Sequence, residues 1–219
     1  NEAALREVEA ARKRGQRVYV ETCPQYLLLD ESVYFNEDYS AAARYVCAPP
    51  LREKGQQAAL WRALRRGEIQ TISTDHCSFT LAQKDAGRED FTKIPGGLPG
   101  VETRGELIYS YGVAAKKLSL AQMCRVLSEN PAKLYGLYPR KGVLAPGSDA
   151  DIVIYDPGDS HVIRAEDCVA NVDYNPYEGF VTAGGIREVW LRGRKTVENG
   201  KVLDTVPAGM YLARGKCNL

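Results

Sequence analysis

Strand-like and helix-like segments alternate along the first third of the chain, and this alternation is what most constrains the fold. Residues 1–14 and 56–66 carry small and aliphatic side chains at helical spacing, which predicts two helices. Residues 17–22, 44–47 and 68–72 are β-branched or alternating runs that predict strands. Because strands separated by helices pair in parallel, we expect an α/β protein with helices outside a parallel sheet.

One aspartate, Asp75, follows the predicted strand 68–72 directly, within the sequence Ser-Thr-Asp-His-Cys-Ser. Barrel enzymes carry their chemistry at the carboxyl ends of strands. A carboxylate held there on rigid backbone is able to bind a metal or to take a proton from a nucleophilic water. The alternative is a structural aspartate that caps a turn or a helix.

A polar loop at residues 81–93 leads into the glycine-proline stretch 94–100. Loops of this length commonly bind something, and prolines give such a stretch a defined backbone shape. Gly96 and Gly97 would let a ligand approach the main chain closely. The alternative is a flexible connector. The spacing of the glycines does not match a dinucleotide-binding fingerprint.

Composition excludes several classes of partner. The chain has 219 residues, of which 44% are hydrophobic and 26% charged, so it is able to bury a core and to form one large or two smaller domains. Its formal charge is +1, with acidic and basic residues interleaved, so we expect no nucleic acid and no anionic membrane as partner. No apolar run approaches the roughly 20 residues that span a bilayer.

The six cysteines are widely spread and form no C-x-x-C pair. This excludes a zinc ribbon and a thioredoxin-like motif. Cysteines inside apolar runs behave as small hydrophobic residues, and we expect a reduced, cytoplasmic protein.

A change in composition after Lys141 predicts a domain boundary. Before it, three helices are expected, at residues 101–115, 119–127 and 131–135. After it come short strand-like runs and turns, and Asn199-Gly200 between two such runs is a strong hairpin signal. We therefore expect βα units over residues 1–141 and an antiparallel β module over residues 142–219.

Six motifs together resemble the dihydropyrimidinase/D-hydantoinase branch of the cyclic amidohydrolases. They are ETCPQYL at 21–27, CAPPLR at 47–52, TDHCSF at 74–79, DFTKIP at 90–95, GSDADIV at 147–153 and DYNPYEG at 173–179. The resemblance runs through essentially the whole chain in one order. The motif at 147–153 alone would mark only the wider superfamily, whereas those at 74–79 and 90–95 point to the hydantoinase branch.

The resemblance implies the carboxyl-terminal part of a metal-dependent TIM barrel with a small β-sandwich, and two divalent metal ions, usually zinc, at the strand ends. The implied reaction opens dihydropyrimidines or 5-substituted hydantoins to N-carbamoyl amino acids by means of a metal-bound hydroxide. Asp75 matches a family metal ligand that also passes a proton to the ring nitrogen. Ala48 and Gly96 match residues that contact the cyclic amide mainly through the backbone. The family often has serine and asparagine at these two positions, which leaves the ring preference open.

The histidines depart from the family pattern. The family uses a His-x-His pair, a carboxylated lysine and two further histidines, but this chain has just His76 and His161. We expect His76 either to hydrogen-bond behind the strand end or simply to pack, and His161 to be an exposed strand residue. By family correspondence the chain looks like the carboxyl-terminal half of an enzyme, inactive alone, with its other metal ligands outside these residues.

The family is typically homotetrameric, and four aromatic residues look exposed: Tyr174, Tyr177, Phe180 and Tyr211. We expect them either to cover the barrel of their own subunit or to join, with the tail 207–219, in an interface.

Two other functions stay open. One is a catalytically inactive relative with a structural or interaction role, against which the presence of Asp75 argues. The other is allantoinase or dihydroorotase, which the motif at 90–95 disfavours.

Overall fold

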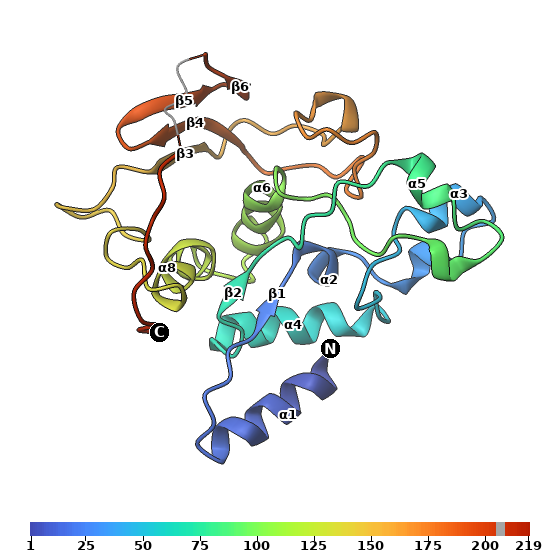
Figure 1. Cartoon of the computed structure of the whole chain (residues 1–219), viewed down its shortest axis with the longest axis horizontal. Coiled ribbons are helices and arrows are strands. Elements are labelled where there is room, and N and C mark those ends of the chain that lie inside the picture. The colour runs from blue at the N-terminus through green and yellow to red at the C-terminus, as the bar shows by residue number, and fades with distance from the viewer. Residues whose placement is uncertain (205–208) are drawn as a thin grey trace.

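The computed structural model describes residues 1–204 and 209–219, and these form a mixed α/β structure with two small sheets (Figure 1). One sheet is the parallel pair β1 (Glu21–Thr22) and β2 (Thr71–Ile72), and the other has the antiparallel order β3-β4-β5-β6. Helix α6 (Arg104–Ile108) lies between the two sheets in Figure 1. The predicted mixture of helices and strands is therefore confirmed.

The parallel pair is joined by a helical crossover, as predicted. Helix α4 (Gly55–Arg66) lies between β1 and β2 in the chain, and Glu21 pairs with Thr71. The helix ends at Gly67, whose φ of +74° is the left-handed conformation that glycine adopts without a steric penalty. Both strands are shorter than the runs that predicted them, at two residues each.

The predicted strand at 44–47 is wrong. The short helix α3 (Tyr39–Ala43) precedes it, and the backbone N–H groups of Tyr45 and Val46 donate back to the carbonyls of Ala42 and Ala43, both at 3.1 Å. These two amides are hydrogen-bonded in a turn at the end of the helix, so they are not available to pair with a neighbouring strand. The Val46 carbonyl instead accepts from a distant loop, described below.

The main hydrophobic core lies between α4 and β2. Leu64, Ile69, Ile72 and Ile108 are each at most 2% exposed and belong to one cluster. Burying each side chain of this size contributes about 1.5–3 kcal/mol to the stability of the folded state. The core thereby fixes the carboxyl end of β2, from which Asp75 follows. Helix α1 (Glu2–Lys13) ends before Gly15 as predicted and packs on the outer side of α4 (Figure 1).

The loop predicted at 81–93 contains ordered structure. Helix α5 (Leu81–Asp85) begins with a capping box in which Thr80 and Gln83 exchange side-chain-to-backbone hydrogen bonds. A 3-10 turn, Phe91–Lys93, follows. These elements are too short to show an apolar periodicity in the sequence, so they were not predicted.

The three helices predicted before Lys141 are present with changed ends. Helix α6 continues into a π-helical segment, Tyr109–Ala114, and α7 (Leu120–Cys124) continues into another, Arg125–Glu129. Ser119 caps α7 by accepting the Gln122 N–H. The third helix is α8 (Asn130–Leu134). Three further short elements are α2 (Pro24–Leu28) and the 3-10 turns Glu31–Tyr34 and Ala165–Asp167.

Antiparallel strands follow Lys141 as predicted. They are β3 (Ile152–Asp156), β4 (Gly185–Leu191), β5 (Arg194–Glu198) and β6 (Lys201–Val202). The predicted hairpin joins β5 to β6: Asn199 and Gly200 have φ of +49° and +75°, as a two-residue primed turn requires. Between β3 and β4, Val162 and Val181 form an isolated antiparallel bridge.

The chain's last residues run back along α8 (Figure 1). Gly215 donates to the Gly136 carbonyl at 2.9 Å, and the Tyr19 hydroxyl donates to the Leu219 carbonyl at 2.9 Å. Two aromatics expected to be exposed are buried, Tyr174 at 3% and Tyr177 at 1% exposure, and Tyr177 belongs to a hydrophobic cluster with Leu98 and Leu107. Tyr211 is 91% exposed. Residues 205–208, which include the start of the predicted tail segment 207–219, lie outside the described residues.

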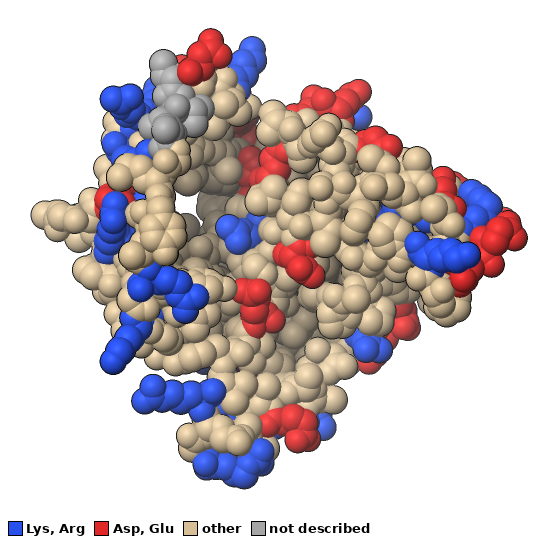
Figure 2. All heavy atoms as spheres, in the orientation of Figure 1, with Lys and Arg blue, Asp and Glu red and all other residues tan. Residues whose placement is uncertain are grey.

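Lys and Arg side chains occur together with Asp and Glu side chains on the face shown in Figure 2. Within residues 1–204 and 209–219, no helix has both the length and the apolar character needed to cross a membrane.

Candidate active site

Three chain segments meet beyond the carboxyl end of β2: residues 46–48, 75–77 and 95–98. The Gly97 N–H donates to the Val46 carbonyl at 3.0 Å, and the Cys77 N–H donates to the Leu98 carbonyl at 3.0 Å. His76 and Leu98 form a parallel bridge. Each of the three segments carries one residue of the predicted site.

Asp75 is the first residue of the segment 75–77 and faces solvent. Its φ is +49°, a left-handed conformation that aspartate tolerates better than most residues. The carbonyl of Asp75 accepts a hydrogen bond from the Cys77 thiol at 3.4 Å. The backbone therefore turns sharply at Asp75, and the exposed carboxylate is accessible to a ligand.

Ala48 and Gly96 adjoin each other, although 48 positions separate them in the sequence. A Cβ placed on Gly96 would lie 3.7 Å from both the Cβ and the backbone nitrogen of Ala48, which is van der Waals contact. Both residues are exposed. The fold thus brings together the two residues that the family resemblance assigned to one cyclic amide.

Gly97 is required by the close approach of the segment 95–98 to the segment 75–77. A Cβ on Gly97 would lie 2.4 Å from the sulfur and 2.6 Å from the Cβ of Cys77, and its φ of +141° is also unfavourable for other residues. This contact keeps the Gly96 segment beside the segment that carries Asp75.

His76 hydrogen-bonds behind the strand end, which is the first of the two roles expected for it. Its Nδ1 accepts the backbone N–H groups of Gly100 at 3.0 Å and Val101 at 3.2 Å. Accepting both requires an unprotonated Nδ1, so the ring proton of the neutral histidine is on Nε2. His76 therefore anchors the end of the glycine-proline stretch.

Lys84 joins the segments 46–48 and 95–98 and is the functional candidate that the sequence did not reveal. Its Nζ donates to the carbonyls of Val46 at 2.8 Å, Pro95 at 2.7 Å and Gly97 at 2.7 Å, and the residue is fully buried. Burial lowers the pKa of Lys84 to about 8. In the sequence it is one lysine among polar residues, which normally indicates a solvated loop, and no signal in one sequence distinguishes it.

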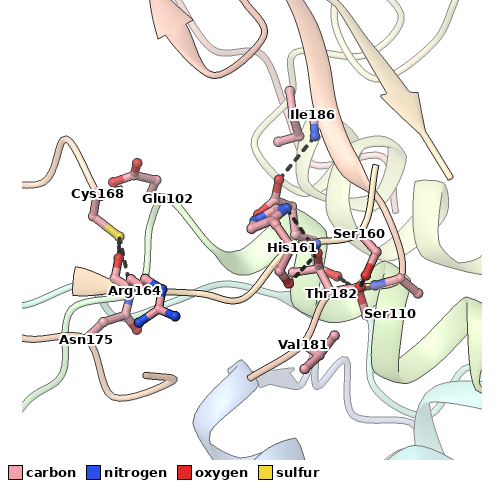
Figure 3. Close-up of polar contacts among 12 residues, drawn as sticks. Glu102, Ser110, Ser160, His161, Arg164, Cys168, Asn175, Val181, Thr182 and Ile186 are labelled. Carbon is pink, nitrogen blue, oxygen red and sulfur yellow. Dashed lines mark hydrogen bonds and ion pairs between the residues drawn. The ribbon is translucent and has the colours of Figure 1, made fainter. Parts of the chain in front are cut away.

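His161 lies elsewhere, against helix α6 (Figure 3). Its Nδ1 is 3.1 Å from the Thr182 hydroxyl, and its Nε2 is 3.5 Å from a carboxylate oxygen of Glu106. Ser110, on the same helical segment, accepts the Ala183 N–H at 2.8 Å. His161 is exposed, as expected, but it is not part of a strand. Its imidazole instead contacts Thr182 and Glu106, where α6 meets the chain that leads into β4.

The donor set of the described residues does not complete a metal centre. Within residues 1–204 and 209–219, no group of three or more His, Cys, Asp or Glu side chains is arranged to hold a metal ion. A catalytic zinc takes about three protein ligands. Asp75 is the single predicted ligand that this chain supplies at the strand end.

The comparisons with known proteins identify the family. The model of the amidohydrolase family matches residues 3–202. The chain is 44% identical to the D-hydantoinase of Geobacillus stearothermophilus over 214 residues, which is 97% of this chain and 45% of that protein. It is 43% identical to the D-hydantoinase of Streptomyces coelicolor, over 98% of this chain and 46% of that protein. The chain belongs to the amidohydrolase family, and it spans about half the length of the curated relatives it matches.

The fold agrees with solved structures of the same group. The crystal structure of dihydropyrimidinase from Brevibacillus agri superposes with a TM-score of 0.89 at 46% identity, over 91% of this chain and 43% of that chain. The L-hydantoinase of Arthrobacter aurescens superposes with a TM-score of 0.84 at 33% identity, over 93% of this chain and 44% of that chain. The similarity therefore extends to enzymes named for both hydantoin stereochemistries.

Proposed function

We propose that this chain takes part in the hydrolysis of cyclic amides, dihydropyrimidines or 5-substituted hydantoins, to N-carbamoyl amino acids. The observation that carries the proposal is that the segment with the exposed residue Asp75 is hydrogen-bonded to the segment 95–98, in which Gly96 adjoins Ala48, beyond a parallel strand pair. Membership of the amidohydrolase family and 44% identity to a D-hydantoinase support the same reaction class.

Asp75 is the proposed proton carrier. The oxygen of a water molecule adds to the ring carbonyl carbon while the carboxylate of Asp75 takes its proton. The bond between that carbon and the ring nitrogen then breaks, and Asp75 returns the proton to the departing nitrogen, so the carboxylate is regenerated. General acid/base action of this kind contributes about 10²–10⁴-fold to a rate.

The backbones of Ala48 and Gly96 are the proposed holders of the amide edge of the ring. A cyclic amide presents a carbonyl acceptor beside an N–H donor, which main-chain N–H and C=O groups complement. Such contacts are independent of side-chain identity. The proposal therefore covers both ring types and does not choose between them.

The proposed metal requirement extends beyond this chain. Asp75 would serve as one ligand of a pair of divalent ions, zinc by the family resemblance, with the remaining ligands supplied from outside these 219 residues. A bound ion of this kind lowers the pKa of its water toward neutrality.

The proposed architecture follows the same resemblance. Residues 1–141 would be βα units of an amidohydrolase TIM barrel, and residues 142–219 a β-sandwich portion with a C-terminal tail. The parallel β1-β2 pair and the antiparallel β3-β6 sheet support this division. We also propose that the full-length protein is a cytoplasmic homotetramer. Light scattering on the full-length protein with and without the tail 207–219 tests the oligomeric state and the part that the tail has in it.

The experiment that tests the function is complementation. Residues 1–219 are mixed with zinc, and bound metal and the opening of dihydrouracil and hydantoin are measured with and without a polypeptide that carries the missing metal ligands. We expect turnover only in the complemented sample. Stoichiometric binding of two metals with turnover by the chain alone would contradict the ligand count, and complementation without turnover would favour an inactive, structural relative.

A further inference from the structure

Lys84 is buried in an unusual way. The residue has no exposed surface, yet no carboxylate among the described residues forms an ion pair with it. Fully buried lysines are rare unless they are paired. The titratable groups that face Lys84 are the thiols of Cys47 and Cys77, and the ring of Phe79 lies 5.7 Å from Nζ.

Backbone carbonyls take the place of a counter-ion. An ammonium group has three N–H donors, and the carbonyls of Val46, Pro95 and Gly97 use all three, at 2.7–2.8 Å. Two of the carbonyls belong to the segment that carries Gly96, and the third belongs to the segment that carries Ala48. The ammonium is thus the common partner of both proposed amide-binding segments.

The hydrogen bond from Lys84 to the Pro95 carbonyl also fixes the direction of the Gly96 N–H group. The Pro95 carbonyl and the Gly96 N–H belong to one planar trans peptide, in which the two groups point in opposite directions. Because the carbonyl points inward to Lys84, the Gly96 N–H points outward, toward the exposed side of this residue. Among the described residues the Gly96 N–H donates to no protein acceptor.

We propose that Lys84 is a positioning residue, whose ammonium group holds the Val46–Ala48 and Pro95–Gly97 segments in register and aims the Gly96 N–H at the carbonyl of a bound cyclic amide. This inference rests on the proposed function. Lys84 does not touch the substrate, because it lies beneath the two segments. Its effect is therefore expected on substrate binding and not on proton transfer by Asp75.

The test compares Lys84→Met with Lys93→Met. Methionine keeps most of the length of the side chain and removes all three donors. Lys93 lies nine residues further along the chain, in the 3-10 turn, and its side chain is 69% exposed. In the complemented protein we expect Lys84→Met to raise the KM for dihydrouracil at least tenfold, with kcat within threefold of the wild type. Lys93→Met should leave both constants unchanged. An unchanged KM in Lys84→Met, or a loss confined to kcat, would overturn the inference.

Hydrogen exchange on the 219-residue chain separates this inference from the proposed function. The Gly97 amide, which donates to Val46, should exchange at least tenfold faster in Lys84→Met than in Lys93→Met. If wild-type protein and Lys93→Met open no cyclic amide, the proposed function fails, and the exchange result still decides whether Lys84 fixes the segments. Equal Gly97 exchange in the two variants overturns that role.

A pH profile of the wild type decides the matter if Lys84→Met does not fold. Burial lowers the pKa of Lys84 to about 8, and the amine formed above this pH has two donors for three carbonyls. We expect the KM to rise at least threefold between pH 7 and pH 9.5 while circular dichroism stays constant. A KM that is flat over this range overturns the inference.

Discussion

The carboxylate of Glu106 lies against the imidazole of His161, with 3.5 Å between Oε2 and Nε2. The other carboxylate oxygen accepts the Ile186 N–H at 3.1 Å (Figure 3). Glu106 therefore connects helix α6 both to His161 and to Ile186 in β4. Burial raises the pKa of Glu106 despite the neighbouring His161.

Glu106→Gln should change how stability depends on pH. The pKa of Glu106 is raised in the folded protein, so between the ordinary value of 4.5 and the raised value the folded state binds more protons than the unfolded state. Stability from this group is therefore present at low pH and is lost as the pH rises through that window. Glutamine keeps an acceptor for Ile186 and removes the titration.

Urea unfolding between pH 4 and pH 7 measures this effect. We expect the loss of stability with rising pH to be smaller in Glu106→Gln than in the wild type. Glu7→Gln, at an exposed position of α1, is the matched control and should follow the wild type. A Glu106→Gln profile parallel to the wild type would show that burial does not perturb this carboxyl.

Lys84→Met should remove a rise of stability with pH, which is opposite in sign to the effect of Glu106. The pKa of Lys84 is about 8 in the folded protein against an ordinary 10.5, so the unfolded state binds more protons between these values. Wild-type stability therefore rises with pH across this window, by on the order of 3 kcal/mol at most. In Lys84→Met the rise disappears. At pH 7 the variant is less stable by at least about 2 kcal/mol, because the Pro95 and Gly97 carbonyls lose their donor.

Chemical denaturation at pH 7, 8, 9 and 10 tests both parts of this prediction. Lys93→Met should keep the wild-type rise. If Lys84→Met equals the wild type at pH 7, the three carbonyl contacts contribute nothing to stability.

Gly97→Ala should destabilise the region around the candidate site. The added Cβ would meet both the Cβ and the sulfur of Cys77 at distances that atoms do not adopt, and the φ of +141° adds strain. We expect a loss of about 2–4 kcal/mol in the free energy of unfolding, the sum of steric displacement and a backbone cost of about 1–3 kcal/mol. The measurement is urea unfolding, with Gly55→Ala as the control, because no atom lies within 4 Å of a Cβ at that position.

Sequence patterns predicted the elements whose stability is local or whose burial is regular. Helix α4 was expected at 56–66 and spans Gly55–Arg66, since one side of it is buried along its length. The β5-β6 hairpin was predicted because Asn199 and Gly200 tolerate positive φ. The strand expected at 44–47 failed because a β-branched and aromatic run does not reveal that its amides are used by the preceding helix.

Part of the candidate site was predicted from the sequence, but Lys84 was not. Asp75 was indicated by its place after a predicted strand, Ala48 and Gly96 by the family resemblance, and the structure brings Ala48 and Gly96 into contact. Lys84 could not be predicted, because its role depends on three carbonyls from two distant segments that converge only in the folded chain. Backbone acceptors have no sequence signature.

Asp75→Asn should retain the fold and remove the proposed proton transfer. Asparagine adopts positive φ as readily as aspartate, so the turn at this position persists without strain. Its amide cannot accept and return a proton at neutral pH, and it is a weaker metal ligand than a carboxylate. In the complemented protein we expect kcat for dihydrouracil to fall by at least about two orders of magnitude, with unfolding unchanged within about 0.5 kcal/mol. Asp204→Asn, at an exposed position remote in sequence, should keep wild-type turnover. Near-normal kcat in Asp75→Asn would exclude Asp75 as the proton carrier.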